Sequence, residues 1–120
     1  MALYYTLPVY RDTYRLILAI FEATRKFPRE YKYTLGQDMK RDGLVLIRSI
    51  YRANKNRDKQ RDLETFQDDL ELLKLQIRLA YDMRIISVKK QVEIIEIMDV
   101  IGRQVSGWKK AGSSARIVQE

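Results

Sequence analysis

The stretch Leu63–Ile86, LETFQDDLELLKLQIRLAYDMRII, decides the fold because its apolar residues follow two separate helical series. The first series recurs at spacings of three and four residues and comprises Leu63, Phe66, Leu70, Leu73, Ile77 and Tyr81. This spacing places side chains on one face of an α-helix. The pattern therefore predicts a helix over about 62–84 with that face toward a core.

The second apolar series runs along the same predicted helix at the same spacings. Its members are Leu72, Leu75, Leu79, Met83 and Ile86. At about 100° per residue, its centre lies roughly opposite the first series. A helix in a lone bundle needs only one apolar stripe, so the second stripe favours a subunit interface in a homo-oligomer. Two alternatives stay open: the chain's own tail covers the stripe, or its leucines are simply exposed.

Helix start and stop signals divide the rest of the chain. Pro8 suits a first helical turn, and Pro28 ends a helix before it. Thr34–Gln37 matches a capping box, and Ser87 is a candidate N-cap. The polar stretch 54–61 is a connection. The predicted helices cover about 7–26, 34–54, 62–84 and 88–109.

These elements predict an all-α fold, an antiparallel up-down four-helix bundle. It forms a single domain over residues 1–110, followed by a flexible tail at 111–120. In the last helix Val88 and Val92 lie at core spacing. Further apolar residues widen its apolar arc to about half the circumference, which also favours an interface: Ile94, Ile97, Met98, Ile101 and Trp108. Isolated glycines indicate close helix approach: Gly36, Gly43, Gly102 and Gly107.

Composition excludes most catalytic chemistry. The 120 residues contain no cysteine and no histidine, which removes the thiolate nucleophile, the commonest general base and the usual zinc ligands. We expect no enzyme activity, no catalytic residue, no cofactor and no metal. Glu93, Glu96 and Asp99 recur at i,i+3, but pairing with Lys89 and Arg103 explains them as surface salt bridges.

The net charge points to anionic partners. Twenty-three Lys and Arg against sixteen Asp and Glu give +7, which favours nucleic acid, anionic lipid or an acidic protein. No apolar run approaches the roughly 20 residues that span a bilayer, so we expect a cytoplasmic protein with no membrane partner.

One basic ridge lies on the predicted helix 34–54. Its residues fall within about 60° of one another over about 20 Å and are Arg41, Arg48, Arg52 and Lys55. The ridge continues into the connection at Arg57, Lys59 and Arg61. It predicts contacts to several phosphates, with affinity that falls steeply with salt. The alternative is a solvated basic face with no partner.

Two smaller groups of residues are also candidates for binding. Lys74 and Arg78 are like charges at i,i+4; they either bind a partner or are neutralised by Glu71 and Asp82. Among the aromatic residues, Tyr31 and Tyr33 are candidates for stacking on bases. We expect the others at core spacing to pack inside the bundle: Tyr10, Tyr14 and Tyr81.

Several motifs resemble a known family. The segment Phe27–Gln37, FPREYKYTLGQ, resembles the helix connection of four-helix-bundle proteins encoded by intervening sequences of bacterial 23S ribosomal RNA genes and by diversity-generating retroelements. Further segments look like the accessory variability protein of those retroelements: Leu73-Lys74, Arg78–Ala80, Ile86-Ser87, Ile101–Arg103 and Gly107-Trp108. The Asn-Ile-Ala-Glu-Gly run common in the ribosomal branch is replaced by Ser49–Asn54.

This resemblance implies a pentameric ring whose basic surface binds the element's reverse transcriptase and its template RNA or cDNA. Such a protein has no catalysis of its own and supports the mutagenic copying, or retrohoming, that diversifies a target gene. Lys74, Arg78 and Arg103 match basic positions of the family pattern. The alternative is a protein of the 23S intervening-sequence type, a structural protein-protein interaction oligomer without nucleic-acid binding.

Overall fold

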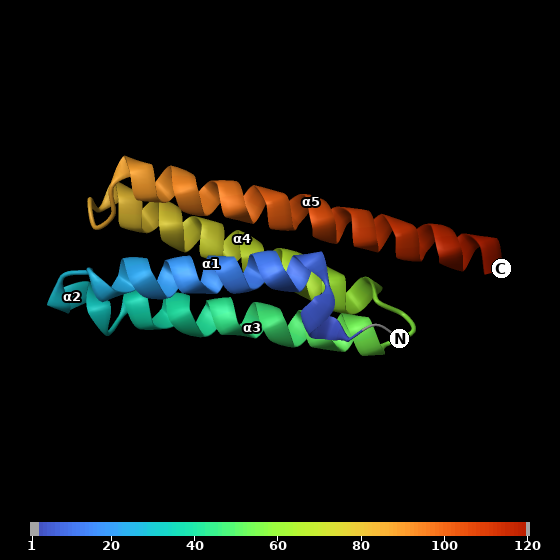
Figure 1. The fold of residues 1–120 in the computed structure, drawn as a ribbon. Helices are drawn as coiled ribbons and strands as arrows, with labels where there is room; N and C mark the ends of the chain where they lie inside the picture. The colour runs from blue at the N-terminus through green and yellow to red at the C-terminus, as the bar shows by residue number, and fades with distance from the viewer. Residues whose placement is uncertain (1–2, 120) are drawn as a thin grey trace.

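The computed structural model describes the backbone of residues 3–119 and the side chains of residues 3–112. A short 3-10 helix, η1 (Tyr4–Thr6), precedes four long helices and one short one (Figure 1). The long helices are α1 (Pro8–Arg25), α3 (Leu35–Lys55), α4 (Gln60–Asp82) and α5 (Val88–Gln119), and the short one is α2 (Arg29–Lys32). The molecule is a rod of 53 × 20 × 20 Å.

The long helices form a square in which each packs against two neighbours. α1 contacts α3 and α5, and α4 also contacts α3 and α5, so α1 and α4 lie diagonally opposite. Neighbouring helices run antiparallel (Figure 1). The predicted up-down four-helix bundle is confirmed, while its assembly into a ring stays a prediction.

The core is filled by the residues that the sequence placed on the first face of α4. Leu63, Phe66, Leu70, Leu73 and Ile77 are all buried. Tyr81 is 36% exposed, so its predicted packing role is wrong. It lies in the last turn of α4, close to the end of the bundle, and Ala80 is the buried residue of that turn.

The second series of α4 points away from the core, as expected from its spacing. Leu72, Leu75, Leu79 and Met83 are exposed in the single chain, and Leu75 is 63% exposed. Ile86 is an exception because it follows the end of α4, is partly buried and packs against the core. The outward stripe is thus confirmed for four residues and wrong for Ile86.

α5 presents its apolar residues differently from the prediction. Ile94, Ile97, Met98 and Ile101 are buried in the core, and Trp108 packs against it, so these residues form no second face. The residues with outward side chains are instead Val88 and Val92. α5 also continues to Gln119, beyond the expected end at 109. The predicted flexible tail, residues 111–120, lies mostly outside the residues whose side chains the structure describes.

Several helix ends follow the predicted signals and others do not. Pro8 opens α1, and Ser87 Oγ accepts a hydrogen bond from Lys90 N at 3.1 Å. Thr34 is the N-cap residue of α3, as predicted, but the capping-box hydrogen bond is not formed. The Thr34 hydroxyl donates to Glu30 O instead, because residues 29–32 already form a helical turn. α4 starts at Gln60 rather than 62, where Asp58 Oδ1 accepts from Gln60 N.

Close helix approach explains only some of the glycines. A Cβ on Gly36 would lie 3.3 Å from Phe27 Cδ2 and from Tyr31 O, so the start of α3 needs glycine to pack there. A Cβ on Gly43 would make an ordinary van der Waals contact, 3.5 Å from Ile17 Cγ1. For Gly102 and Gly107 the prediction is wrong, since no described atom lies within 4 Å of the added Cβ.

Candidate nucleic-acid and partner interface

The basic ridge lies on the outer surface of α3, as its spacing predicted. Arg41, Arg48, Arg52 and Lys55 are all exposed. Arg41 is held by two carboxylates, with Nη1 3.4 Å from Asp38 Oδ1 and Nε 3.2 Å from Asp42 Oδ1. Its charge is therefore largely compensated.

Acidic residues on α4 flank the middle of this ridge. Burial raises the pKa of Asp69, the charges of Asp42 and Asp68 raise it further, and Arg48 opposes this rise. Asp42, Asp68 and Asp69 therefore form an acidic group, and the charge of Arg48 interacts with Asp69. Because of this group, the ridge is weaker as an anion-binding surface than the sequence alone indicated.

Lys59 in the following connection has a structural role. Its Nζ donates to Ala53 O and to Asn56 O, both at 2.7 Å, and lies 3.5 Å from Asn54 O. The last carbonyls of a helix have no partner within the helix, so the ammonium group satisfies the C-terminus of α3. Lys59 does not extend the ridge, whereas Arg57 and Arg61 remain exposed.

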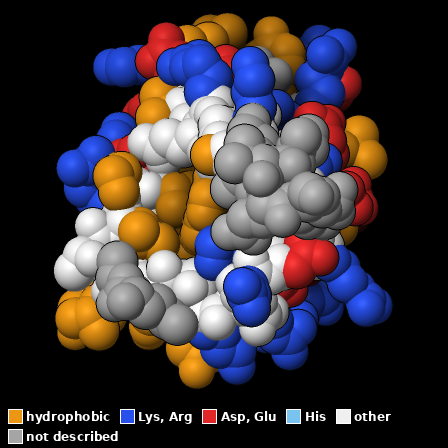
Figure 2. Space-filling model, turned by 90° about the vertical axis from the view of Figure 1, so that its right-hand side faces the viewer, with side chains coloured by type: hydrophobic (Ala, Val, Ile, Leu, Met, Phe, Trp, Pro, Cys, Tyr) orange, Lys and Arg blue, Asp and Glu red, His pale blue; other side chains and the backbone are white. Residues whose placement is uncertain are grey.

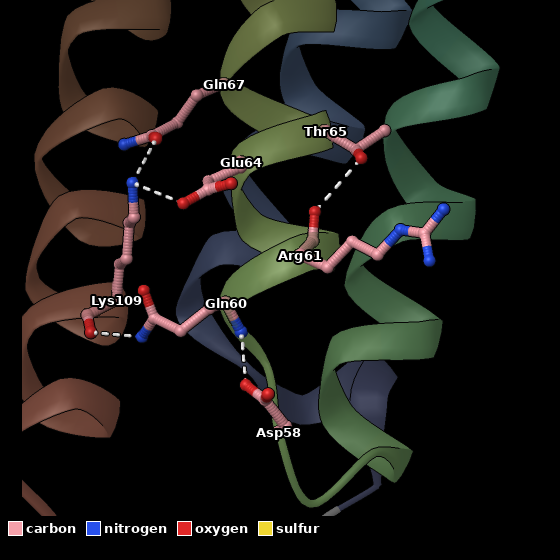
Figure 3. Close-up of polar contacts among 7 residues, drawn as sticks. All are labelled: Asp58, Gln60, Arg61, Glu64, Thr65, Gln67 and Lys109. Carbon is pink, nitrogen blue, oxygen red and sulfur yellow. Dashed lines mark hydrogen bonds and ion pairs between the residues drawn. The ribbon is translucent and has the colours of Figure 1, made fainter. Parts of the chain in front are cut away.

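The end of the bundle that carries both η1 and residues 56–59 is called the terminal end. Figure 2 looks directly at it and shows Lys and Arg side chains on several sides, interrupted by acidic and hydrophobic ones. Lys109 of α5 bridges to α4, with Nζ 3.5 Å from Glu64 Oε1 and 3.3 Å from Gln67 Oε1 (Figure 3). Gln60 Nε2 donates to Lys109 O at 2.9 Å. These groups join the two helices.

The three basic residues that match the family pattern lie on α4 and α5. Lys74 Nζ is 3.5 Å from Glu71 Oε1, and Arg78 Nε donates to both carboxylate oxygens of Asp82 at 3.1 Å. Glu71 and Asp82 thus pair with these two cations, as one of the two alternatives predicted, and a binding role for Lys74 and Arg78 stays a prediction. Arg103 is exposed and lines, with Lys74, an open hollow of about 500 Å³ between α4 and α5.

The seven predicted basic residues therefore form no single surface. Four lie along α3, while Lys74, Arg78 and Arg103 lie on α4 and α5. Ion pairs take up Arg41, Lys74 and Arg78. The expected pairs on α5 also differ, because Lys90 rather than Lys89 binds Glu93, at 3.3 Å.

A basic cluster that the sequence analysis missed lies at the opposite end of the bundle, beside α2. Figure 1 places α2 and the α4–α5 connection together at this end. We call its members the α2-end cations: Arg25, Lys26, Arg29, Lys32, Lys40, Arg84 and Lys89. Among the described side chains, none of the seven takes part in an ion pair. Nearby, Lys90 bridges Glu22 and Glu93, so two of the local acids are already paired.

The cluster was missed because its members come from four separate segments. Each segment carries only a few charges, and none forms a periodic ridge. The up-down topology itself was the available signal, because it brings residues 26–34 and 83–87 to one end. Arg84 adopts a left-handed conformation with φ 62° in that second connection.

Aromatic residues accompany the cations at this end. Tyr33 is 67% exposed and remains a candidate for stacking on a base. Tyr31 is partly buried and packs against the core, which removes it as a candidate.

Tyr14 is exposed on α1, so the expectation that it packs inside was wrong, while Tyr10 is partly buried against the core.

The described residues offer neither an acidic metal-binding group nor a membrane-spanning helix. Within the described residues, no group of three or more Asp or Glu side chains is placed to hold a metal ion. Over residues 3–119, no helix combines the length and apolar character that a membrane span requires.

Comparison with known proteins identifies the family. A search of curated proteins finds no significant match. A family model described as bAvd-like matches residues 9–112, which include α1 to α4 and most of α5. The match therefore covers nearly all of the four-helix bundle and most of the chain. The protein belongs to the bAvd-like family of bacterial accessory variability determinants.

Proposed function

We propose that the protein is a non-catalytic accessory subunit of a diversity-generating retroelement. It binds the template RNA or cDNA and docks the reverse transcriptase of the element, and so supports mutagenic retrohoming. Membership of the bAvd-like family supports the accessory role. The observation that carries the nucleic-acid part is the cluster of seven α2-end cations, which lack ion pairs in the described structure.

The α2-end cations have no ion pair in the described structure, whereas Arg41, Lys74 and Arg78 do. Clustered like charges repel, and a polyanion relieves that repulsion while its counterions are released. Exposed Tyr33 lies in the same region, and stacking on a single-stranded base contributes roughly 1–3 kcal/mol. The cluster contacts phosphates rather than base edges, so we expect it to bind single strands with little sequence preference.

The proposed assembly is a homo-oligomer, the pentameric ring that the family resemblance implies. Several copies together present several α2 ends to one strand, which raises the overall affinity through multivalency. The exposed stripe of α4 supports self-association, because leucines at 44–63% exposure are unusual on a helix face that already has a buried side. The reverse transcriptase docks on the assembled particle.

The test is binding of a fluorescent single-stranded RNA measured by anisotropy at a series of salt concentrations. The variant Arg25→Gln, Arg29→Gln, Arg84→Gln, Lys89→Gln removes four α2-end charges. The matched control removes four ridge charges: Arg41→Gln, Arg48→Gln, Arg52→Gln and Lys55→Gln. At about 0.7 per phosphate contact, the first variant should flatten the log–log salt slope by about 3 and weaken binding more than tenfold at low salt.

The control should lose less, because Arg41 is already paired and the charge of Arg48 interacts with Asp69. Absence of RNA binding by the unmodified protein at low salt would contradict the nucleic-acid proposal. Equal losses in both variants would contradict its assignment to the α2 end. Co-purification with the reverse transcriptase, with and without nuclease treatment, tests the other half of the proposal.

The second candidate function is a structural interaction oligomer that binds no nucleic acid. It is favoured by the number of cations that already serve the fold, such as Lys59 and Lys109. In that case the reverse transcriptase would co-purify with the four-charge variant as well as with the unmodified protein, and RNA would bind to neither.

A further inference from the structure

A hollow lies at the α2 end of the bundle, where the last turns of α1, the short helix α2 and the start of α3 meet (Figure 1). We call it the α1–α3 hollow. Its volume of about 610 Å³ is within the roughly 300–1,000 Å³ of pockets that bind small molecules. The lining side chains that matter here are Leu18, Phe21, Glu22 and Arg25 of α1, Lys32 of α2 and Lys40 of α3.

The α1 wall of the hollow follows from helical spacing. Leu18, Phe21, Glu22 and Arg25 recur at intervals of three, one and three residues, so they share one outer face of the helix. Leu18 and Phe21 are both exposed on this face. The wall therefore offers an apolar surface that includes an aromatic ring.

Three cations surround the hollow, and none has an ion pair among the described side chains: Arg25, Lys32 and Lys40. Lys32 and Lys40 are half-buried, so their stems lie along the wall and hold the two ammonium groups beside the hollow. Lys40 Nζ lies 5.6 Å from the centre of the Phe21 ring, close to the outer limit of a cation–π contact. A phosphate would form stronger, charge-assisted hydrogen bonds with these groups.

The carboxylate on the wall, Glu22, is partly compensated from α5. Lys90 Nζ lies 3.7 Å from Glu22 Oε1 and 3.3 Å from Glu93 Oε2. The hydroxyl of Thr24, also on the wall, already donates to Ile20 O at 2.8 Å. Three cations therefore face one partly compensated carboxylate, and the hollow is positively charged. Glu22 remains able to accept a hydrogen bond from a hydroxyl or amino group of a bound molecule.

Two other hollows between helices have a different charge balance. In the hollow of about 500 Å³ between α4 and α5, Lys74 is already paired with Glu71. The hollow of about 440 Å³ between α1 and α5 has three carboxylates in its lining, from Glu22, Glu93 and Glu96. The α1–α3 hollow is the one of these three that combines cations without ion pairs and an exposed aromatic ring.

We propose that the α1–α3 hollow binds one phosphorylated nucleoside, either free or at the phosphate-bearing end of a single strand. The phosphate lies among Arg25, Lys32 and Lys40, and the base packs on Phe21. A terminal phosphate carries a charge of about −1.5 to −2 at pH 7. It matches three cations better than an internal phosphodiester, which carries a single negative charge. The inference rests on the nucleic-acid binding of the proposed function and assigns a strand end to one part of the α2-end cations.

Lys40 connects the two parts of the proposed site. In the unbound chain its ammonium group lies over the Phe21 ring. When the ammonium group moves to the phosphate, it leaves the ring face to the base. Stacking on an aromatic ring tolerates any base. The site therefore distinguishes phosphorylated from unphosphorylated ends and has little preference among the four bases.

The first test compares single-stranded RNAs that share one sequence and an internal fluorophore but differ in their ends. One carries a 5′-phosphate, one a 3′-phosphate and one neither. Anisotropy with the full chain at low salt should show at least one phosphorylated strand bound about tenfold more tightly than the unphosphorylated one, as expected for one or two charge-assisted hydrogen bonds.

The variant Lys32→Gln, Lys40→Gln should lose this preference for a phosphorylated end. Its matched control is Lys26→Gln, Arg29→Gln, which removes two α2-end cations that do not line the hollow. The control should weaken the binding of all three strands alike and keep the preference. Circular dichroism checks that both variants are folded.

The second test measures a free nucleotide, with a fluorescent nucleoside monophosphate as the probe. An unlabelled nucleoside monophosphate should displace the probe at lower concentration than either the nucleoside or inorganic phosphate. Phe21→Leu should remove the advantage of the nucleotide over inorganic phosphate. Tyr14→Leu, which replaces another exposed aromatic residue of α1 outside the lining, should keep that advantage.

The strand and the free nucleotide are distinguished by which of the two tests succeeds. A preference for phosphorylated ends assigns the hollow to a strand end, and nucleotide binding without that preference assigns it to a free nucleotide. Absence of both would overturn the proposal, and so would equal effects of the two double-charge variants. An unchanged nucleotide advantage in Phe21→Leu would overturn the contact between the base and the ring.

This inference and the proposed function fail separately. If RNA binds with no preference for its ends and the probe does not bind, the nucleic-acid function stands and the nucleotide site fails. If the probe binds through Lys32 and Lys40 but RNA does not bind, the nucleotide site stands and the nucleic-acid function fails.

Discussion

The two ends of this bundle use their basic residues in opposite ways. At the terminal end, Lys59 satisfies helix carbonyls, and Lys109 joins α4 to α5. At the α2 end, seven cations have no ion pair among the described side chains. The comparison shows that a net charge of +7 does not say which charges are available to a partner. That depends on the contacts each side chain makes.

Asp12 gives the terminal end a buried charge that exposed cations support. Its side chain is almost fully buried and accepts hydrogen bonds from Gln104 Nε2 at 2.7 Å and Arg15 Nη1 at 3.2 Å. Burial raises the pKa of Asp12, but the Gln104 hydrogen bond and the charges of Arg11 and Arg15 together outweigh it and lower the pKa below the ordinary value.

The largest expected effect on stability comes from Asp12→Ala. It leaves the Gln104 amide buried without its acceptor, so we expect a loss of roughly 2 kcal/mol in urea denaturation at neutral pH. The lowered pKa means that the contribution of Asp12 is present above pH 3.8 and is lost as pH falls below it. The variant should lack this acid-dependent part, and an equal acid dependence in both proteins would contradict the assignment.

A smaller loss is expected from Lys59→Met, which keeps the apolar stem and removes the ammonium group. Loss of the hydrogen bonds to the α3 carbonyls should lower the free energy of unfolding by about 1 kcal/mol. Lys89→Met at the α2 end is the matched control and should leave it unchanged. Equal effects of the two substitutions in thermal or urea unfolding would remove the contrast between the ends.

The smallest effect is expected at the α2 end itself. Lys26→Gln with Arg29→Gln removes two exposed cations that have no ion pair in the described structure, so stability should stay within about 0.5 kcal/mol. Any change at low salt should be a gain, since like-charge repulsion decreases, and salt should abolish it. A clear loss of stability would show that these residues serve the fold after all.

Local spacing was sufficient to predict the features that depend on one helix. The inward series of α4 and the outward leucines follow from a period of 3.6 residues, and both occur as expected. α5 was harder because apolar residues occupy most positions from Val92 to Ile101. Its core direction is set by packing on α1 and α4, which buries Ile94 and leaves Val92 exposed.

The candidate site was harder to predict than the fold. Whether Lys59 binds a phosphate or a helix terminus depends on where the chain turns after α3. The short helix α2 occupies the connection expected to hold the Thr34 cap, which redirects the Thr34 hydroxyl to Glu30. The α2-end cations become one cluster only after four segments meet in three dimensions.

The order of the helices has a consequence for how the chain folds. Three of the four helix pairings join consecutive long helices, and only α1 with α5 brings distant segments together. A low average sequence separation between contacts favours folding in microseconds to milliseconds. Asp12 and Gln104 are 92 positions apart in the sequence. Their hydrogen bond therefore forms when α1 and α5 pair, which is the folding step with the largest entropy cost of loop closure.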